Sequence, residues 1–159
     1  MISFVSDFLS SIEHDVAYDY CLSAKYSYGE VDNSDTPPTG MTQNISGHEY
    51  IYKVFNKKLR ENFDFLNDHR IDRMYVNCFA PGENPYFHID NDRGGYTALY
   101  YPNKTWERND GGETQFLIDN NIQGVVPLPN RLVIFDSRLV HRATSFRDKH
   151  RFTYAIKFV

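Results

Sequence analysis

The stretch Tyr86-Phe87-His88-Ile89-Asp90-Asn91 is the part of the chain around which the fold can be predicted. On an extended strand, residues two apart point to the same face, so His88 and Asp90 present an imidazole and a carboxylate side by side. A second imidazole, His141, comes much later in the chain. Two histidines and one carboxylate are the facial ligand set typical of non-haem Fe(II), which leaves open positions for substrate and O₂. The pattern predicts a metal site on His88, Asp90 and His141.

The other four histidines are not expected to bind a metal. None of them has a carboxylate two residues further along the chain. We therefore expect surface or capping roles for His14, His48, His69 and His150.

The C-terminal segment adds a cation to this set. Its side chains alternate, and large apolar residues share one face: Phe152, Tyr154, Ile156 and Phe158. Smaller and polar residues share the other face: Arg151, Thr153, Ala155 and Lys157. We expect the apolar face to pack on helices and the polar face to line the site. The Arg151 guanidinium could then clamp a carboxylate through two parallel hydrogen bonds.

Composition limits the classes of protein that the chain can represent. A length of 159 residues with 41% apolar content suits one domain, and the 12 Tyr and 12 Phe favour a β-rich body. The net charge of −4 gives no electrostatic reason to expect nucleic acid or an anionic membrane as a partner. No apolar run approaches the roughly 18–20 residues of a membrane span, and no signal peptide is recognisable. We interpret Cys21 and Cys78 as reduced core thiols of a cytoplasmic protein.

Two helices are predicted in the first part of the chain. Ser10–Glu13 and Ser46–Glu49 both have the capping-box form S-x-x-E, the first before a helix of about residues 11–24 and the second before a helix that ends near Asn62. The first helix carries an apolar stripe of Ile12, Val16, Ala17, Tyr20, Cys21 and Ala24. Between the helices, residues 28–45 are rich in Gly, Pro, Asn and Asp, and we predict either a lid over the site or a disordered surface loop.

From Ile71 onward, short strand-like segments alternate with turn residues. They lie near residues 72–79, 85–91, 96–102, 113–118, 122–127, 131–135, 138–145 and 151–158. Eight such strands predict a double-stranded β-helix, or jelly roll. The predicted fold class is mainly β with N-terminal helices. We expect one domain over residues 1–159, in which residues 1–70 give helical support and a loop and residues 71–159 form the jelly-roll core.

Over roughly residues 71–159 the sequence resembles the prolyl 4-hydroxylase-like branch of the 2-oxoglutarate/Fe(II)-dependent oxygenases. The matching motifs are His88-x-Asp90, Tyr100-Tyr101-Pro102-Asn103-Lys104-x-Trp106, Gly111-Gly112-Glu113-Thr114, Arg131-Leu132-Val133-Ile134-Phe135, His141 and Arg151-x-x-Tyr154-Ala155-Ile156. The resemblance implies Fe(II) on the two histidines and the aspartate, with 2-oxoglutarate as co-substrate. It further implies that Arg151 binds the far carboxylate of 2-oxoglutarate, that O₂ is consumed, and that ascorbate is an accessory reductant.

The resemblance also suggests further co-substrate contacts. Tyr101 matches a family tyrosine that hydrogen-bonds the far carboxylate, with core packing as the alternative. A second family tyrosine falls at Phe79, so that hydroxyl is missing here. Tyr75 lies four residues earlier on the same face and is a candidate to replace it, and Thr153 could add a contact beside Arg151.

The implied activity is hydroxylation of a prolyl residue in a peptide or protein, with decarboxylation of 2-oxoglutarate to succinate and CO₂. Two alternatives stay open: an oxygenase acting on a small molecule such as a free amino acid, and a metal-binding jelly-roll module without catalysis. Nucleic-acid demethylation is disfavoured, because related enzymes typically carry a second arginine six residues beyond the first, where this chain has Lys157. We expect neither nucleic acid nor membrane as a partner.

Overall fold

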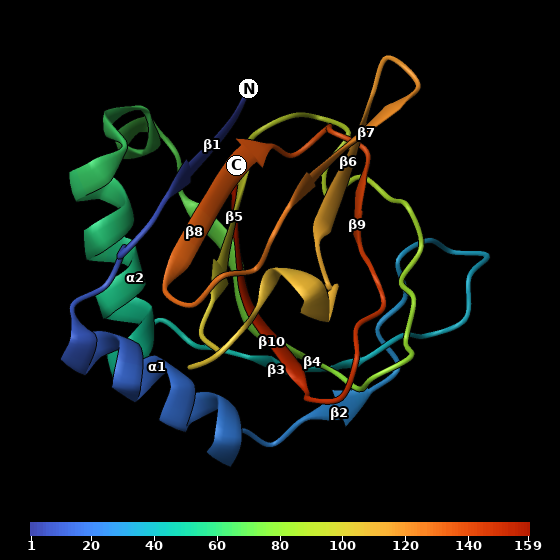
Figure 1. Cartoon of the computed structure of the whole chain (residues 1–159). Helices are drawn as coiled ribbons and strands as arrows, with labels where there is room; N and C mark the ends of the chain where they lie inside the picture. The colour runs from blue at the N-terminus through green and yellow to red at the C-terminus, as the bar shows by residue number, and fades with distance from the viewer.

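Two antiparallel sheets form the body of the protein, described here over residues 1–159 by a computed structural model (Figure 1). The larger sheet has the strand order β1-β8-β5-β10-β4-β3-β2, and the smaller has the order β7-β6-β9. The strands are β1 (Ile2–Val5), β2 (Ser27–Tyr28), β3 (Met41–Asn44), β4 (Ile71–Phe79), β5 (Tyr96–Tyr101), β6 (Thr114–Ile118), β7 (Asn121–Val125), β8 (Arg131–Asp136), β9 (His141–Ala143) and β10 (Arg151–Phe158). The predicted fold class, a jelly roll supported by N-terminal helices, is confirmed.

Helices α1 (Ser11–Ser23) and α2 (Tyr50–Asn62) cover the outer face of the seven-stranded sheet (Figure 1). Two short 3₁₀ helices, η1 (Asp64–Asp68) and η2 (Arg108–Asp110), connect other elements. No helix combines the length and the apolar character that crossing a membrane requires.

Strand β10 shows how one sequence pattern builds both the core and the cavity. Four of its side chains join the large core beneath the helices: Phe152, Tyr154, Ile156 and Phe158. The ring centroids of Tyr154 and Phe55 of α2 are 4.8 Å apart, which ties the sheet to the helix. On the opposite face Ala155 packs between the two sheets, and the three polar residues Arg151, Thr153 and Lys157 line a cavity. The predicted two-faced strand is therefore confirmed.

The two predicted capping boxes behave differently. Ser10 is the N-cap of α1, and its hydroxyl and the Glu13 side chain exchange hydrogen bonds with each other's backbone N–H groups. At the second site the Ser46 N–H and hydroxyl both donate to Glu49 Oε1. Those bonds close a turn that precedes the helix, because α2 begins at Tyr50 and has no side-chain cap.

The buried face of α1 differs from the predicted stripe. Ile12 and Val16, expected inside, are 74% and 36% exposed, whereas His14, Ala17 and Cys21 are buried. The prediction of His14 as a surface or capping residue was therefore wrong. Its Nδ1 lies 2.5 Å from the Tyr100 hydroxyl, which satisfies the buried imidazole. Apolar residues occur around the whole helix, so their spacing alone did not determine which side packs.

Several strand predictions also need correction. Residues 85–91 form an extended loop with one isolated bridge, between His88 and His141, rather than a full strand. The predicted strand at 138–145 shrinks to β9. Strands β1, β2 and β3 were not predicted, and β3 lies inside the expected loop of residues 28–45, where it pairs with β4. These short strands lie at or near a sheet edge, and their stability depends on partners that are distant in sequence.

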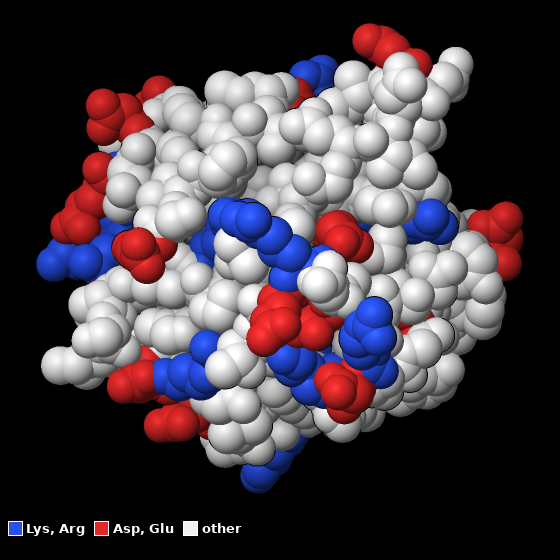
Figure 2. All heavy atoms as spheres, in the orientation of Figure 1, with Lys and Arg blue, Asp and Glu red and all other residues white.

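Charged side chains are interspersed on the face seen in Figure 2. Lysine and arginine lie next to aspartate and glutamate, and much of the remaining surface in this view is uncharged. This face therefore presents no continuous field of one sign.

Candidate metal and co-substrate site

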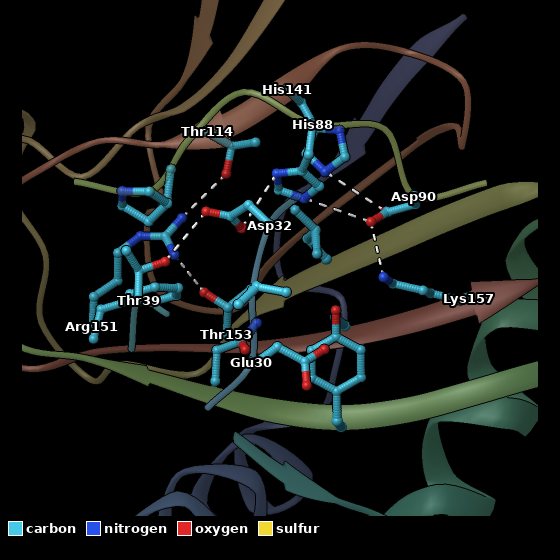
Figure 3. A pocket seen from close by; sticks show the side chains of 18 of the residues that line it. Glu30, Asp32, Thr39, His88, Asp90, Thr114, His141, Arg151, Thr153 and Lys157 are labelled. Carbon is cyan, nitrogen blue, oxygen red and sulfur yellow. Dashed lines mark hydrogen bonds and ion pairs between the residues drawn. The ribbon is translucent and has the colours of Figure 1, made fainter. Parts of the chain in front are cut away.

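A cavity of about 260 Å³ lies between the sheets, and it contains the residues that the sequence singled out (Figure 3). Its walls come from the inward faces of β4 and β10, from the segment around His88 and Asp90, and from residues 30–39. His88, Asp90 and His141 lie toward one end, and Arg151 lies toward the other. The cavity thus joins a candidate metal centre to a buried cation.

Backbone pairing brings the three candidate ligands together. The His88 N–H donates to the His141 carbonyl over 3.0 Å, and the His141 N–H donates to the His88 carbonyl over 2.9 Å. The Asp90 N–H donates to the carbonyl of Ser137. One ligand atom from each of the three side chains then lies within 4.8 Å of the others. The set therefore forms without the continuous strand that the sequence predicted at residues 85–91.

Each imidazole is oriented by a hydrogen bond at Nδ1. His88 Nδ1 is 2.9 Å from the Tyr86 carbonyl oxygen, and His141 Nδ1 is 2.8 Å from the Leu139 carbonyl oxygen. A carbonyl can only accept, so both Nδ1 atoms carry the proton and both Nε2 atoms have free lone pairs. Burial lowers the pKa of His141, which favours the neutral ring that a metal binds.

The Asp90 carboxylate is held at both oxygens. The Thr97 hydroxyl donates to Oδ2 over 2.5 Å, and Lys157 Nζ lies 2.9 Å from Oδ1. Burial acts to raise the pKa of Asp90, but the charge of Lys157 and the hydrogen bonds from Lys157 and Thr97 outweigh it and hold the pKa below its ordinary value. Burial likewise acts to lower the pKa of Lys157, and Tyr75 and Asp90 together raise it. The pair is therefore a charged carboxylate facing a charged ammonium.

These three side chains fit a divalent metal ion. The Nε2 atoms of His88 and His141 lie 3.7 Å and 3.6 Å from the Asp90 carboxylate oxygens, and neither Nε2 has a hydrogen bond within the protein. Two nitrogens and one carboxylate oxygen that converge on a cavity are the donor set of the facial triad. The carbonyls behind the two rings supply the outer contacts that orient metal-binding imidazoles.

Arg151 at the other end is buried without an opposite charge. It is 2% exposed, and no carboxylate oxygen lies within 4.0 Å of its nitrogens. Its hydrogen bonds go to neutral acceptors: Nε to the Gly112 carbonyl (2.9 Å), Nη1 to Thr153 Oγ1 (2.7 Å) and Nη2 to Thr114 Oγ1 (3.1 Å). A guanidinium has five N–H donors, so two remain for a ligand.

Burial also affects the acidity of this guanidinium. It lowers the pKa of Arg151, while Tyr101 and Glu113 act in the opposite direction, and arginine remains protonated in proteins. A buried charge without a partner is unfavourable. The Arg151 end of the cavity is therefore suited to an anion that comes from solution.

The Gly111-Gly112 motif has a steric role at this end. Gly112 has a φ of +75°, and a Cβ built on it would lie 2.8 Å from Trp106 Cζ2 and 3.4 Å from Arg151 Cδ. Only glycine allows the backbone to approach the arginine this closely and present its carbonyl to Nε.

The structure places the other predicted co-substrate residues at different depths. Thr153 lines the cavity and accepts from Arg151, whereas the Tyr101 hydroxyl lies behind the wall, 2.7 Å from Thr114 Oγ1. Phe79 is the residue that pairs with Arg151 across the sheet. Tyr75 lies four residues away, roughly 13 Å along an extended strand, and its ring centroid is 5.3 Å from Lys157 Nζ. Tyr75 therefore lies nearer the metal end of the cavity than Phe79 does, and its role as a replacement for the missing hydroxyl stays a prediction.

Three residues in contact with the candidate site were not assigned to it from the sequence. The alternation of the last strand places Lys157 on its inward face, so the sequence did indicate that this side chain would approach the cavity. Thr97 and Thr114 come from β5 and β6, and nothing in their local sequence indicates that they would contact Asp90 and Arg151.

Residues 30–39 form one wall of the cavity. Asp32 Oδ2 accepts from the Tyr86 N–H (2.8 Å) and the Thr39 hydroxyl (3.2 Å), and Oδ1 lies 3.4 Å from His88 Nδ1. Asn33 donates to the Phe87 carbonyl, so this segment lies beside the one that carries His88, as Figure 1 also shows. The predicted loop thus lies against the site, and its movement as a lid stays a prediction.

Comparisons with known proteins agree with this geometry. A sequence profile described as the 2OG-Fe(II) oxygenase superfamily matches residues 74–158. No curated protein sequence gives a significant match.

Solved structures share the fold over almost the whole chain. A Pseudomonas putida prolyl-4-hydroxylase aligns with a TM-score of 0.77 at 19% identity, covering 99% of this chain and 91% of that one. A Trichoplax adhaerens prolyl hydroxylase, in complex with a hypoxia inducible factor oxygen degradation domain peptide fragment, gives 0.76 at 22% identity, with 99% and 82% covered. HygX from Streptomyces hygroscopicus, with nickel and 2-oxoglutarate bound, gives 0.75 at 10% identity, with 99% and 82% covered.

Identities this low show a common fold, and the family assignment rests on the profile. The profile spans more than half of the chain and includes His88, Asp90, His141 and Arg151. Fe(II) and 2-oxoglutarate are therefore the cofactor and co-substrate, and the chain belongs to the 2OG-Fe(II) oxygenase superfamily.

Proposed function

We propose that this protein is a dioxygenase that hydroxylates a prolyl residue in a peptide or protein, with conversion of 2-oxoglutarate to succinate and CO₂. In this proposal His88, Asp90 and His141 bind Fe(II), and Arg151 binds the far carboxylate of 2-oxoglutarate. The observation that carries it is the buried Arg151 guanidinium, which lacks a carboxylate partner and shares one cavity with the His-Asp-His set.

The protein's own contribution is to position the reactants. When bound, Fe(II) and 2-oxoglutarate supply the O₂ activation that inserts oxygen into a C–H bond. Thr153 and Thr114 fix the guanidinium plane, so that its two free N–H groups can hold a carboxylate in one orientation. Apolar wall residues such as Phe79 and Leu99 help to exclude water from the cavity.

The prolyl substrate is the finer part of the proposal. Structural neighbours that include prolyl hydroxylases support it, one of them in complex with a peptide fragment. Ascorbate remains an expected accessory reductant. We also propose a cytoplasmic location, which the free, buried thiols of Cys21 and Cys78 support.

We propose further that residues 1–159 act as a single domain, with residues 1–70 supporting the jelly-roll core. A core cluster that joins α1 and α2 to β4, β5, β8 and β10 supports this division. Neither part would keep its buried surface without the other.

A small molecule such as a free amino acid is the second candidate substrate. Residues 30–39 form part of the cavity wall, where Glu30 is paired with Arg73 and Asp32 has no lysine or arginine partner. The Asp32 carboxylate would suit a substrate with an ammonium group.

The test measures 2-oxoglutarate decarboxylation by the Fe(II)-loaded protein with proline-rich peptides and, separately, with free proline. Peptide-stimulated turnover and a mass gain of one oxygen atom on the peptide are expected. Stimulation by free proline alone would favour the small-molecule candidate.

A variant pair tests the metal site. His141→Ala should lose bound metal and reduce turnover to background, because one of three ligands is removed. His150→Ala, at an exposed histidine, is the matched control and should keep both. Full turnover in His141→Ala, or a wild-type protein that binds neither Fe(II) nor Mn(II), would contradict the enzyme proposal.

A further inference from the structure

Lys157 is a partly buried cation to which the proposed function gives no role. It lies on the inward face of β10, its side chain is 23% exposed, and its Nζ is 2.9 Å from Asp90 Oδ1 (Figure 3). No other lysine or arginine forms an ion pair with a candidate metal ligand.

This ion pair lies between two cavities. Lys157 and Asp90 line the cavity described above, and together with Thr97 they also line a second cavity of about 620 Å³ on the side of Arg93 and Gly95. The ammonium therefore lies where the two cavities meet, directly behind the candidate metal ligand.

The ion pair restricts how Asp90 can bind a metal. Lys157 engages Oδ1 and Thr97 engages Oδ2, so neither oxygen is free of a protein contact. Each oxygen keeps a second lone pair on which a metal could bind, so the two contacts leave the carboxylate able to act as a ligand. Together they hold the plane of the carboxylate in one orientation toward the cavity.

The charge of Lys157 also affects how tightly the site binds its metal and its co-substrate. A cation next to Asp90 repels a divalent metal and attracts an anionic co-substrate, and both effects are strong in a buried site. The two ligands of the cavity should therefore respond in opposite ways to the loss of this charge.

We propose that Lys157 is a positioning residue that holds the Asp90 carboxylate in one orientation, and that its charge makes the site bind its metal less tightly and its co-substrate more tightly. The proposal rests on the metal-ligand and co-substrate roles given under the proposed function. A purely structural ion pair makes a different prediction, because removing it would loosen the site and weaken both ligands.

The test is a pair of binding titrations on the whole protein. Mn(II) is titrated into metal-free protein, and 2-oxoglutarate is then titrated into the Mn(II)-loaded protein, both by calorimetry. In Lys157→Met, which removes the charge and keeps an unbranched chain, we expect the Kd of Mn(II) to fall about fivefold or more and the Kd of 2-oxoglutarate to rise by a similar factor. Lys157→Arg should restore both values toward wild type.

Lys149→Met is the matched control. Lys149 makes an ion pair of the same length with Asp110, 2.9 Å, and neither residue lines the cavity. Both Kd values should stay unchanged in this variant.

Each other outcome overturns the proposal. Weaker binding of both ligands in Lys157→Met would show a structural role, and unchanged binding would show no role. If Lys157→Met fails to fold, Lys157→Gln, which is neutral but keeps an N–H donor, should show the same opposite shifts. A wild-type protein that binds no Mn(II) would instead contradict the proposed function, so the two failures can be told apart.

Discussion

Arg151 and Lys157 lie on the same face of one strand, yet their surroundings differ. Lys157 contacts the Asp90 carboxylate, whereas Arg151 donates only to a carbonyl and two hydroxyls. Neutral acceptors satisfy the hydrogen bonds of a guanidinium without cancelling its charge. The two ends of the cavity therefore suit ligands of opposite charge, a metal ion at one end and an anion at the other.

The largest effect is expected when the charge of Arg151, which has no carboxylate partner, is removed. Arg151→Met should raise the KM for 2-oxoglutarate about ten- to hundredfold while metal stays bound, because a charge-assisted hydrogen bond contributes about 1.5–3 kcal/mol. The free energy of unfolding of the metal-free protein should not fall with it, since a buried charge without a partner is itself unfavourable. Steady-state kinetics, metal analysis and urea denaturation measure the three quantities.

The control for this variant is Arg147→Met, at an exposed arginine. Its KM for 2-oxoglutarate should remain at the wild-type value. Loss of metal from Arg151→Met at an unchanged KM would show that the two ends of the cavity had been wrongly assigned.

Substitutions of the two threonines that contact Asp90 and Arg151 should have effects of intermediate size. Thr97→Val removes the hydroxyl that donates to Asp90, and the affinity for Mn(II) should fall about tenfold, the lower end of the usual effect of such outer contacts. Thr114→Val removes an acceptor from Arg151, and the KM for 2-oxoglutarate should rise about two- to tenfold with little change in metal affinity. Calorimetry and kinetics on both variants would refute the separation if each threonine affected both ligands equally.

The smallest expected effect is a lower KM for 2-oxoglutarate. Phe79 pairs with Arg151 across the sheet and lines the cavity, so Phe79→Tyr would add a hydroxyl near the anion-binding end. One neutral hydrogen bond should lower the KM for 2-oxoglutarate about two- to fivefold. An unchanged or higher KM in steady-state kinetics would show that this end needs no further donor.

Much of the jelly roll was predictable because its strands carry a clear alternation. In β10 the side chains alternate, so one face packs on the helices and the other lines the cavity. This division could be predicted without knowing which strands pair with β10. Strand β8 shows the same alternation in the structure, where Leu132 and Ile134 pack toward the helices and Val133 and Phe135 pack between the sheets.

The errors have a common physical cause. The apolar residues of α1 did not define one face, so Ile12 and Val16 were placed inside and His14 outside, whereas the hydrogen bond between His14 and Tyr100 favours the reverse. The loop that carries His88 was mistaken for a strand, because alternation does not show whether a ladder partner extends along the whole segment.

By itself, the sequence determined which side chains could form a metal site and that Arg151 and Lys157 would face inward, because strand periodicity is a local property. Only the tertiary structure decided that Lys157 would meet Asp90, that Arg151 would meet no carboxylate, and that residues 30–39 would lie against His88. These are contacts between residues far apart in the chain. The packing of whole elements sets such contacts, and no local pattern encodes which charge will be neutralised.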